Sequence, residues 1–394
     1  MRIRRRLSRP HPVLLWTKRL IRRVGAACLH PFASLRTRNM SPPQNPLQDT
    51  VVPLPYIRYS YTQRCWTNGP SKPKQLRIEE LPNHIGLVTW NVDMSWSDAP
   101  GRLWCALNFL QGEIFKCPEG TMPRPCAVLL QEVAHAAFAA LLAHPWVCAQ
   151  FYVLPPSPGF WPPGATYGAV TLVSRNIRVA RGLSVAYGGS RMQRTALITD
   201  VLVGVGAGPT KQARALRIVN THLESLEAGT EQRAQQLWTL ARWLHDHQVV
   251  GAVAGGDMNA IAPADETHVR RNRLRDAWDD VPARSRGYGA TWGFQSRRKT
   301  DVQHAPGRLD KFLYRPGSAF EISGPWIIGQ GLKTADGEWV SDHYGLGDRV
   351  REHEVQEGQR ALVAEQPHVA HEAYARGQQR RAGGGRYGEK RGRV

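Results

Sequence analysis

The sequence lacks the patterns that indicate a zinc site, a disulfide framework or a membrane span. Its six cysteines form no C-x-x-C pair and have no histidine cluster beside them, which argues against a zinc site. No secretory signal is visible in the chain of 394 residues, so an intracellular protein with reduced thiols is favoured. The apolar runs near the N-terminus are too short to span a membrane, and the sequence shows no internal repeat.

Acidic residues are absent from the first 48 residues, which hold 11 lysines and arginines. Residues 351–394 hold 9 basic and 6 acidic residues, so the part between carries only +6 of the net charge of +20. Basic ends suit a polyanion such as nucleic acid or an organelle address, with a solvated tail of no specific role as the alternative. The first segment resembles a mitochondrial presequence; a nuclear basic segment and a translation start at Met40 are the rival interpretations. We therefore expect an intracellular protein of the nucleus or the mitochondrion.

Composition divides the chain into four segments. Residues 1–48 are expected to be disordered or a targeting signal, and residues 49–83 to be a Pro-rich linker. Residues 84–350 carry the apolar patterns of a folded domain, and a hydrophobic content of 42% is enough for a sizeable core. Residues 351–394 include a Gly/Arg-rich tail that cannot build a core, so we expect them to be disordered.

Short apolar runs of strand length recur through the domain. They cover residues 85–90, 127–130, 167–173, 195–203, 216–219, 249–253 and 308–314, and residues 341–346 close the domain. Helical patterns are seen at 134–143 and from about 231 to 245. Many strands with few, well-separated helices predict an α/β (α+β) fold, in which two packed, mostly antiparallel sheets are flanked by helices in a four-layer α/β sandwich.

The stretch Val249–Asn259 is the one around which the domain is organised. Its apolar part ends at two glycines, which are followed by Asp257 and Asn259. Polar residues also follow the other strands: Asn91, Glu132, His222, Ser225, Arg308, Asp310, Asp342 and His343. One polar strand end is easily a turn, but turns would use Gly, Pro and Ser as readily, so the repetition predicts a shared pocket. Ligands commonly bind at strand ends in layered α/β folds.

The residue types at these strand ends suit phosphoryl transfer. Glu132 is a hard oxygen ligand for Mg²⁺, which usually takes only one or two protein carboxylates. Asp257 can orient or deprotonate a water for in-line attack on phosphorus. Asn259, Asn91 and His222 supply donors for phosphoryl oxygens. Phosphoryl transfer needs little beyond such positioning and charge.

Asp342 and His343 are adjacent near the end of the domain. The Asp342 carboxylate is expected to fix the tautomer of the His343 imidazole and to favour its charged form. A charged His343 would stabilise a pentacovalent transition state. Arg308 and Asp310 are predicted to form a structural ion pair that supports the site, with a direct catalytic role as the alternative. Three further acids are predicted to lie in turns or at the surface: Asp93, Asp265 and Asp276.

The order of the motifs resembles that of the endonuclease/exonuclease/phosphatase superfamily. The order is Thr-Trp-Asn, Leu-Gln-Glu, Thr-His-Leu-Glu-Ser, Gly-Asp-x-Asn, Arg-x-Asp and Ser-Asp-His, and it covers residues 85–346. Within the superfamily, the motifs around Asn91, Glu132 and His222 are most similar to those of the 5′-tyrosyl-DNA phosphodiesterases (type 2) and their fungal-type relatives.

The resemblance implies a role for each matching residue. Glu132 would hold Mg²⁺, with Mn²⁺ as an alternative. The catalytic residues would be Asp257 and Asn259 at the attacking water, Asn91 and His222 on the phosphate, and His343 with Asp342 in the transition state. The substrate would be bound by Trp292, Arg194, Arg233 and Ser225. Trp292 would stack on a base in the nucleic-acid path, and burial as plain core is its alternative.

The implied function is Mg²⁺-dependent hydrolysis of 5′-phosphotyrosyl bonds in protein–DNA adducts, a DNA-repair reaction. The expected partners are DNA ends with a covalent tyrosyl adduct and single-stranded nucleic acid. One alternative is another phosphoesterase of the same fold: an abasic-site endonuclease, a deadenylase, or a phospholipid or inositol phosphatase. The other alternative is a non-enzymatic nucleic-acid-binding protein. Two departures from the family pattern bear on substrate and partners: Ala260-Ile261-Ala262 replaces Leu-Arg-Asp, and the ubiquitin-binding module of the animal enzymes is not recognisable.

Overall fold

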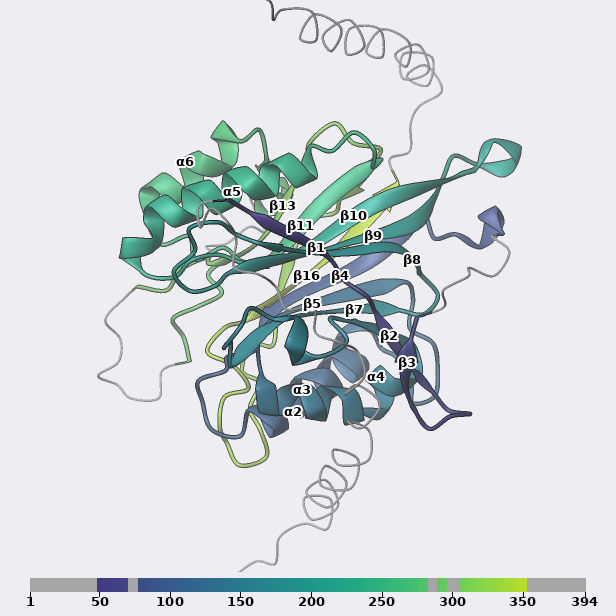
Figure 1. The fold of residues 1–394 in the computed structure, drawn as a ribbon, viewed down its shortest axis with the longest axis horizontal. Coiled ribbons are helices and arrows are strands. Elements are labelled where there is room, and N and C mark those ends of the chain that lie inside the picture. Colours follow the sequence, from purple (N-terminus) through teal and green to yellow (C-terminus); the bar gives the residue numbers. More distant parts are fainter. Residues whose placement is uncertain (1–47, 70–76, 283–288, 296–304, 353–394) are drawn as a thin grey trace, which may run out of the picture. The chain divides into compact units, whose positions relative to one another are not determined.

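The computed structural model describes residues 48–69, 77–282, 289–295 and 305–352. These residues form two sheets that pack face to face, with helices on both outer faces (Figure 1). The predicted four-layer α/β sandwich is confirmed. The terminal segments predicted at 1–48 and 351–394 lie almost wholly outside the described residues.

One sheet has seven strands and the other nine in the described part of the chain. The seven-stranded sheet has the order β1 (Thr50–Pro53), β8 (Arg178–Ala186), β9 (Thr195–Val205), β10 (Gln212–His222), β11 (Gly251–Asp257), β13 (Asp310–Tyr314) and β12 (Arg275–Asp276). The nine-stranded sheet has the order β14 (Phe320–Ile322), β16 (Gly345–Glu352), β4 (His84–Asn91), β5 (Cys126–Ala134), β7 (Tyr167–Ser174), β6 (Phe151–Leu154), β2 (Ile57–Ser60) and β3 (Cys65–Asn68), with β15 (Trp326–Ile328) beside β16. Neighbouring strands run antiparallel except in the pairs β4–β5 and β10–β11.

The helices cover the two outer faces of the sandwich (Figure 1). The nine-stranded sheet carries α2 (Ala99–Phe109), α3 (His135–Ala143) and α4 (Pro145–Gln150), and the seven-stranded sheet carries α5 (Thr230–Leu244) and α6 (Pro263–Arg271). A π-helical turn follows α2 at Leu110–Ile114, and short 3-10 turns lie at Ile78–Glu80, Pro158–Phe160, Gly208–Thr210, Glu227–Gly229 and Ala277–Asp280. None of the helices described has both the length and the apolarity that a membrane span requires.

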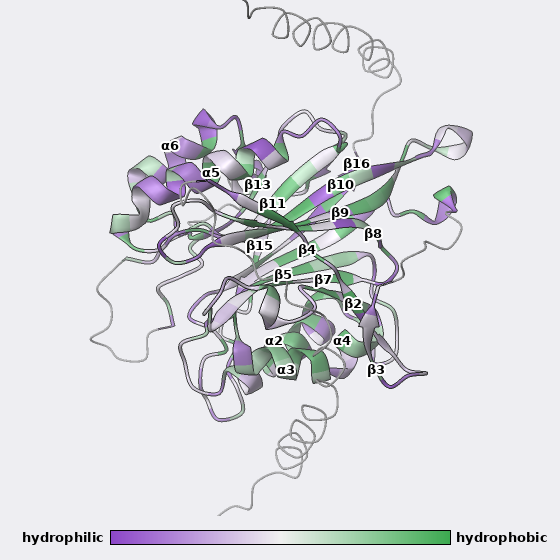
Figure 2. Cartoon of the chain, in the orientation of Figure 1, coloured by the Kyte–Doolittle hydropathy of each residue, from purple (hydrophilic) through white to green (hydrophobic). Residues whose placement is uncertain are grey.

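Side chains of successive strand residues point into different apolar layers. In β5, Leu129 packs between the two sheets and Leu130 packs under α2 and α3. In β10, Ile218 packs between the sheets and Val219 packs under α5. This period of two is what a sheet buried on both faces requires. Figure 2 shows α3 as hydrophobic and α6 as hydrophilic over much of its length.

Residues 49–83, which were predicted to be a linker, take part in both sheets. β1 pairs with β8 in one sheet, and β2 pairs with β3 and β6 in the other. Ile57 and Trp66 of this segment are buried in the core. Each of these strands has only four residues, too few for an alternating pattern to be seen in a Pro-rich sequence. Residues 49–69 are therefore an integral part of the sandwich.

Candidate active site

The two parallel strand pairs bring polar strand ends to one edge of the sandwich. His222 at the end of β10 lies opposite Asp257 at the end of β11, and Asn91 at the end of β4 lies opposite Gln131 in β5. β13 runs antiparallel to β11, so Asp310 at its start also lies opposite Asp257. The two sheets meet at this edge, because Asn91 Nδ2 donates to Asp257 Oδ2 at 3.1 Å. The predicted convergence of distant strand ends is therefore present.

A glycine and an Asx turn place Asp257. The φ of Gly256 is +159°, and a Cβ there would lie 1.8 Å from the carbonyl oxygen of Thr221, so only glycine permits this approach. Asp257 Oδ1 accepts the backbone N–H of Asn259 at 2.9 Å, and Asn259 takes a left-handed φ of +46° that asparagine tolerates. Asn259 Nδ2 donates to the carbonyl of Leu223 at 3.0 Å, which ties the turn to the chain that follows β10. The carboxylate of Asp257 is therefore rigidly held.

Glu132 is turned toward the same edge by a bulge in β5. The register between β5 and β7 shifts at this point, and Glu132 has a φ of +57°, which is unusual for a non-glycine residue. Its Oε2 accepts the backbone N–H of Met94 at 3.1 Å. Its Oε1 lies 3.9 Å from His222 Nε2, and that nitrogen lies 3.3 Å from Asp257 Oδ2. The carboxylates of Glu132 and Asp257 therefore face the same imidazole from two sheets.

The imidazole of His343 is held by Asp310, not by Asp342. Nδ1 of His343 lies 2.8 Å from Asp310 Oδ2, whereas Asp342 Oδ1 lies 4.0 Å from the other ring nitrogen, Nε2. The prediction that Asp342 fixes the tautomer of His343 is thereby corrected, because the residue adjacent in sequence accepts a hydrogen bond from Trp292 Nε1 at 3.2 Å instead. Asp342 still favours the charged form of the ring. The same geometry leaves Nε2 of His343 facing Asp257 Oδ2 at 3.8 Å.

The carboxylates around His343 determine its charge. Burial alone would lower the pKa of His343, but Asp310, Asp342 and Asp257 outweigh it and raise the pKa well above its usual value. Burial would raise the pKa of Asp257, but His343 and His222 hold this pKa well below its ordinary range. Burial raises the pKa of Asp342 to about 6. At neutral pH the site therefore contains a cationic imidazole beside an anionic Asp257.

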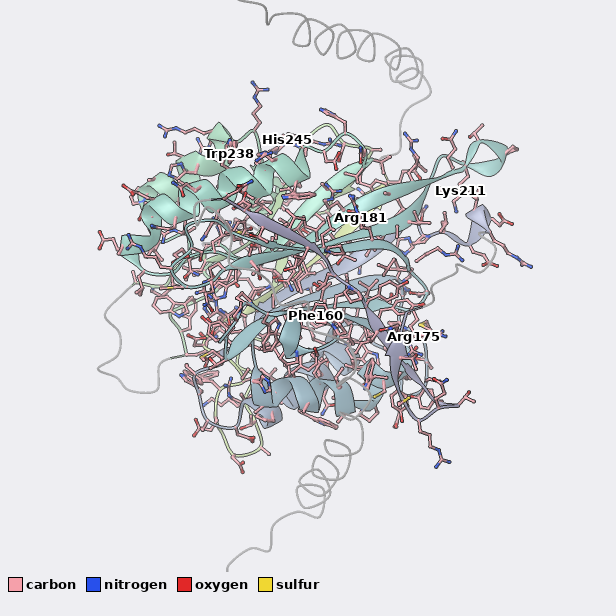
Figure 3. All side chains as sticks on the ribbon, in the orientation of Figure 1. Phe160, Arg175, Arg181, Lys211, Trp238 and His245 are labelled. Carbon is pink, nitrogen blue, oxygen red and sulfur yellow. The ribbon has the colours of Figure 1, made fainter. Side chains whose placement is uncertain are left out.

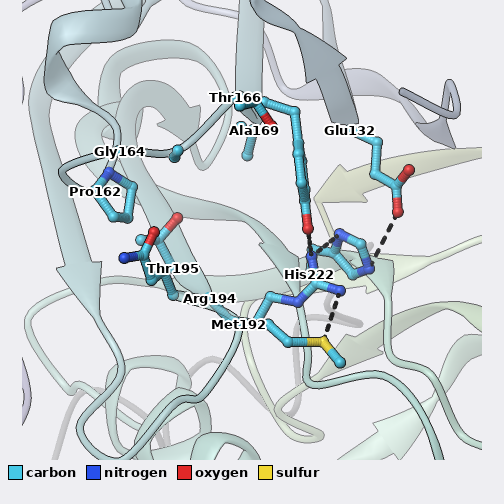
Figure 4. A pocket seen from close by; sticks show the side chains of 13 residues that line it. Glu132, Pro162, Gly164, Thr166, Ala169, Met192, Arg194, Thr195 and His222 are labelled. Carbon is cyan, nitrogen blue, oxygen red and sulfur yellow. Dashed lines mark hydrogen bonds and ion pairs between the residues drawn. The ribbon is translucent and has the colours of Figure 1, made fainter. Parts of the chain in front are cut away.

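A cavity of about 190 Å³ opens beside Glu132 and His222 (Figure 4). Arg194 lines it and donates from one nitrogen to His222 Nδ1 at 2.9 Å and to the Tyr167 hydroxyl at 3.2 Å, and from another to Ser225 Oγ at 2.7 Å. Because a guanidinium only donates, Nδ1 of His222 is the acceptor and the proton of a neutral His222 is on Nε2. Arg194 is buried, yet none of its partners in the described part of the chain is a carboxylate, and its Nε has no hydrogen-bond partner there. A buried cation in this state suits an anionic ligand.

Arg233 lies in a buried ion pair and half-buried Arg308 pairs with a buried acid, which corrects two predictions. Arg233 Nε donates to Asp265 Oδ1 at 2.9 Å, and the other nitrogens of Arg233 bond to nearby backbone and hydroxyl oxygens, so it supports the turn after β10 and is not available to a substrate. Arg308 pairs with Asp276, as does Lys311 at 3.1 Å, so Arg308 does not pair with Asp310. The three acids predicted to lie in turns or at the surface are buried: Asp93, Asp265 and Asp276.

Three aromatic residues beside the site were not singled out from the sequence. Phe294 is 49% exposed and stacks on Tyr344, with ring centroids 5.5 Å apart. Half-buried Trp292 lies next to them and forms a β-bridge with His343, so it is not plain core. The third of these aromatic residues is Tyr167, which lies at the start of β7. This strand runs antiparallel to β5 and so brings Tyr167 to the same edge of the sheet. Its position at the start of a predicted strand was the signal that the sequence offered.

Potential metal ligands lie around Asp257. Among the described residues, one group of three, Asp257, Asp310 and His343, has ligand atoms within 4.8 Å of one another. His343 is unsuited to ligation, because Nδ1 is bonded to Asp310 and a raised pKa keeps the ring protonated, whereas a ligating histidine must be neutral. Glu132 fits better, since its carboxylate is partly exposed and lies 3.9 Å from His222 Nε2, the nitrogen that also lies 3.3 Å from Asp257 Oδ2. Such oxygen donors suit Mg²⁺ or Mn²⁺.

The sandwich and its cluster of acids, amides and histidines define a class of protein. Residues 88–343 match the sequence profile of the Endonuclease/Exonuclease/phosphatase family, and the chain belongs to this family. No curated protein sequence matches the chain.

Among solved structures, those of TDP2 share this fold. Humanised D. rerio TDP2 with 14 mutations has a TM-score of 0.53 and 18% identity, and the match covers 68% of this chain and 99% of that one. D. rerio TDP2 complexed with single strand DNA product has a TM-score of 0.53 and 17% identity, and the match again covers 68% of this chain and 99% of that one. C. elegans TDP2 has a TM-score of 0.52 and 18% identity, and the match covers 69% of this chain and 76% of that one. The resemblance predicted from the motifs is confirmed, and at these identities the likeness concerns the fold.

Proposed function

We propose that this protein is a metal-dependent phosphodiesterase that hydrolyses 5′-phosphotyrosyl bonds at DNA ends. Water would attack the phosphorus, the bond to the tyrosyl phenolic oxygen would break, and the products would be a DNA 5′-phosphate and a free tyrosyl hydroxyl. The observation that carries the proposal is the cationic His343 facing the anionic Asp257 at 3.8 Å, between two sheets whose strand ends converge there. Phosphoryl transfer depends on such fixed charges.

Asp257 is suited to the attacking water. Its carboxylate is fixed by the backbone N–H of Asn259 and by Asn91 Nδ2, and its lowered pKa keeps it ionised. An ionised, immobile carboxylate can orient a water and accept its proton. His343 would donate from Nε2 to a phosphoryl oxygen, since its Nδ1 is already bonded to Asp310.

Glu132 would hold the metal ion, with Asp257 and Asn91 close by. A divalent ion bound there would neutralise negative charge on the phosphoryl oxygens. The protein contributes the orientation of Glu132, whose carboxylate is held by the N–H of Met94 and whose backbone is turned outward by the bulge in β5. Removal of the metal with EDTA should abolish hydrolysis, and Mg²⁺ or Mn²⁺ should restore it.

Arg194 and the neighbouring cavity would receive the anionic substrate. A phosphate oxygen or the oxygen of the departing phenol would be the negatively charged partner of Arg194. The ring of Tyr167 and the exposed pair Phe294 and Tyr344 add aromatic surface on which bases or a tyrosyl ring can stack. Because a buried cation and an aromatic surface lie in the same region, we expect the substrate to be a phosphodiester with an aromatic group. The TDP2 structure with single strand DNA product also supports a DNA substrate.

A substrate panel tests the proposal. The purified chain would be given a 5′-phosphotyrosyl oligonucleotide, an abasic-site duplex, poly(A) and inositol phosphates, each with Mg²⁺ and with EDTA. We expect the fastest hydrolysis on the phosphotyrosyl substrate and none in EDTA. Faster hydrolysis of another phosphoester would assign that activity instead, and EDTA-insensitive binding without hydrolysis of any of them would indicate a nucleic-acid-binding protein.

A further inference from the structure

Glu224 lies behind the Arg194 cavity and contacts none of the catalytic side chains directly. Its side chain is fully buried. Its carboxylate accepts four hydrogen bonds: from the hydroxyl of Ser190 at 2.7 Å, from the backbone N–H groups of Arg191 and Met192 at 2.9 Å each, and from Gln236 Nε2 at 3.0 Å. No lysine or arginine of the described residues forms an ion pair with it.

These contacts fix the loop of the hairpin between β8 and β9. The backbone N–H of Tyr187 donates to the carbonyl of Arg194 at 3.1 Å and closes the loop. The Ser190 hydroxyl donates to Glu224 and accepts the backbone N–H of Arg194 at 2.8 Å. A hydroxyl that donates to a carboxylate is a stronger acceptor, so the two bonds reinforce each other. A continuous path of hydrogen bonds thus runs from Gln236 in α5 to the backbone of Arg194.

We propose that Glu224 is a positioning residue that holds the Arg194 guanidinium against His222 and the cavity. Hairpin loops are otherwise mobile, and a long arginine side chain loses much conformational entropy when it is fixed. Charge-assisted bonds from the Arg191 and Met192 N–H groups to a carboxylate offset this cost more than neutral bonds would. Glu224 thereby sets both the direction of Arg194 and, through the bond to Nδ1, the tautomer of His222. This inference rests on the proposed function in that Arg194 meets an anion there.

A double-mutant cycle separates positioning from a merely structural role. Glu224→Gln keeps the shape but removes the charge, and we expect kcat/KM on the phosphotyrosyl substrate to fall about 10- to 100-fold, as for other supporting residues of active sites. In an Arg194→Ala background the same change should cost less than about twofold, because no guanidinium remains to be positioned. Equal losses in both backgrounds would show that Glu224 only stabilises the loop.

Asp200 provides the matched control. Asp200 lies in β9 and, like Glu224, has a buried carboxylate. Unlike Glu224, it forms ion pairs in the described part of the chain, with Arg217 and with Arg181 (labelled in Figure 3). Asp200→Asn should lower the melting temperature and leave kcat/KM per folded molecule unchanged. A loss of activity in Asp200→Asn as large as that in Glu224→Gln would assign the effect to general destabilisation.

Phosphate binding tests the inference without turnover. Inorganic phosphate should raise the melting temperature of the wild type, and Glu224→Gln and Arg194→Ala should each lose the same part of this shift. The double variant should lose no more than either single variant. Equal phosphate affinity of the wild type and Glu224→Gln would contradict the positioning role. A chain that shows the expected binding pattern but hydrolyses no phosphoester would fail the proposed function and retain the positioning role.

Discussion

Two buried cations lie at the same edge of the sandwich, and their surroundings differ. His343 faces three carboxylates, those of Asp310, Asp342 and Asp257. Arg194 contacts a hydroxyl of Ser225, other neutral groups and no carboxylate among the described residues. The charge of His343 is therefore balanced by carboxylates of the protein, whereas the charge of Arg194 would be balanced by a bound anionic ligand.

The difference assigns distinct tasks to the two cations. His343 is already held in place by carboxylates in the free protein. Its imidazole therefore need not reorient when negative charge develops on the substrate, so we expect His343 to stabilise the transition state. A cation left without an anion gains most when an anionic group arrives, so Arg194 acts on substrate binding as well. The comparison predicts that loss of His343 lowers kcat and that loss of Arg194 raises KM.

Between the two cations, the larger effect is expected from His343→Ala. Removal of a fixed donor to the transition state should lower kcat about a thousandfold, with little change in KM. Single-turnover hydrolysis of the phosphotyrosyl oligonucleotide measures this. A KM effect larger than the kcat effect would remove the distinction between the two cations.

Asp310→Asn should lower kcat by about a hundredfold, because the ring of His343 loses its orientation and one of the charges that keep it protonated. In the wild type, activity should fall on the alkaline side, with an apparent pKa well above 6.5, the usual value for histidine. Asp310→Asn should move this limb to lower pH. An alkaline limb at the same pH in both proteins would show that His343 does not control it.

The same pKa shift predicts a dependence of stability on pH. The folded pKa of His343 is raised above its unfolded value. Its contribution to the free energy of unfolding is therefore complete below the unfolded pKa and is lost as pH rises through the folded pKa. Urea unfolding should show a larger difference between the wild type and His343→Ala near about pH 6 than near about pH 10. A difference that grows with pH would contradict the assigned charge.

Arg194→Ala should lower kcat/KM about 10- to 100-fold, the range for a lost hydrogen bond to a charged group, with most of the loss in KM. Arg194→Lys keeps the charge and loses the forked geometry, so it should recover only part of the loss. Initial rates over a range of substrate concentrations separate the two parameters. Full recovery by lysine would mean that charge alone matters.

Trp292→Ala should have the smallest effect, about five- to tenfold in affinity for a single-stranded oligonucleotide, because one stacked base is lost. Its Nε1 also bonds to Asp342, so Trp292→Phe serves as the control that keeps the stacking surface. Fluorescence anisotropy with a labelled strand measures both. An alanine variant that binds as tightly as the wild type would place Trp292 off the nucleic-acid path.

Much of the fold was visible in the sequence, because most long strands carry their own signal, although the nine-residue strand β8 was not predicted. The run from Thr195 was predicted to 203 and extends to Val205, and the helix predicted from about residue 231 is α5. The strands of residues 50–68 were missed because each is only four residues long and is held by pairing with distant β8 and β6. α2 was missed because Pro100 and Gly101 in its first turn mask the helical pattern, although Asp98 caps it.

The sequence also predicted the members of the site better than their partners. Asn91, Glu132, His222, Asp257 and His343 do converge. Their pairings depend on register across two sheets, which adjacency in sequence does not encode. Asp310 reaches His343 because β13 lies beside β11, and Asp342 is turned toward Trp292 although it is adjacent to His343.

Asp257 is the central residue of the proposed site, because it links the two sheets and faces both histidines. The most direct test is hydrolysis of a 5′-phosphotyrosyl oligonucleotide in Mg²⁺ by the wild type and by Asp257→Asn, with melting temperatures measured alongside. We predict hydrolysis by the wild type, a rate lower by at least about a thousandfold in the folded variant, and no hydrolysis by either protein in EDTA. Hydrolysis by Asp257→Asn at the wild-type rate would contradict the account.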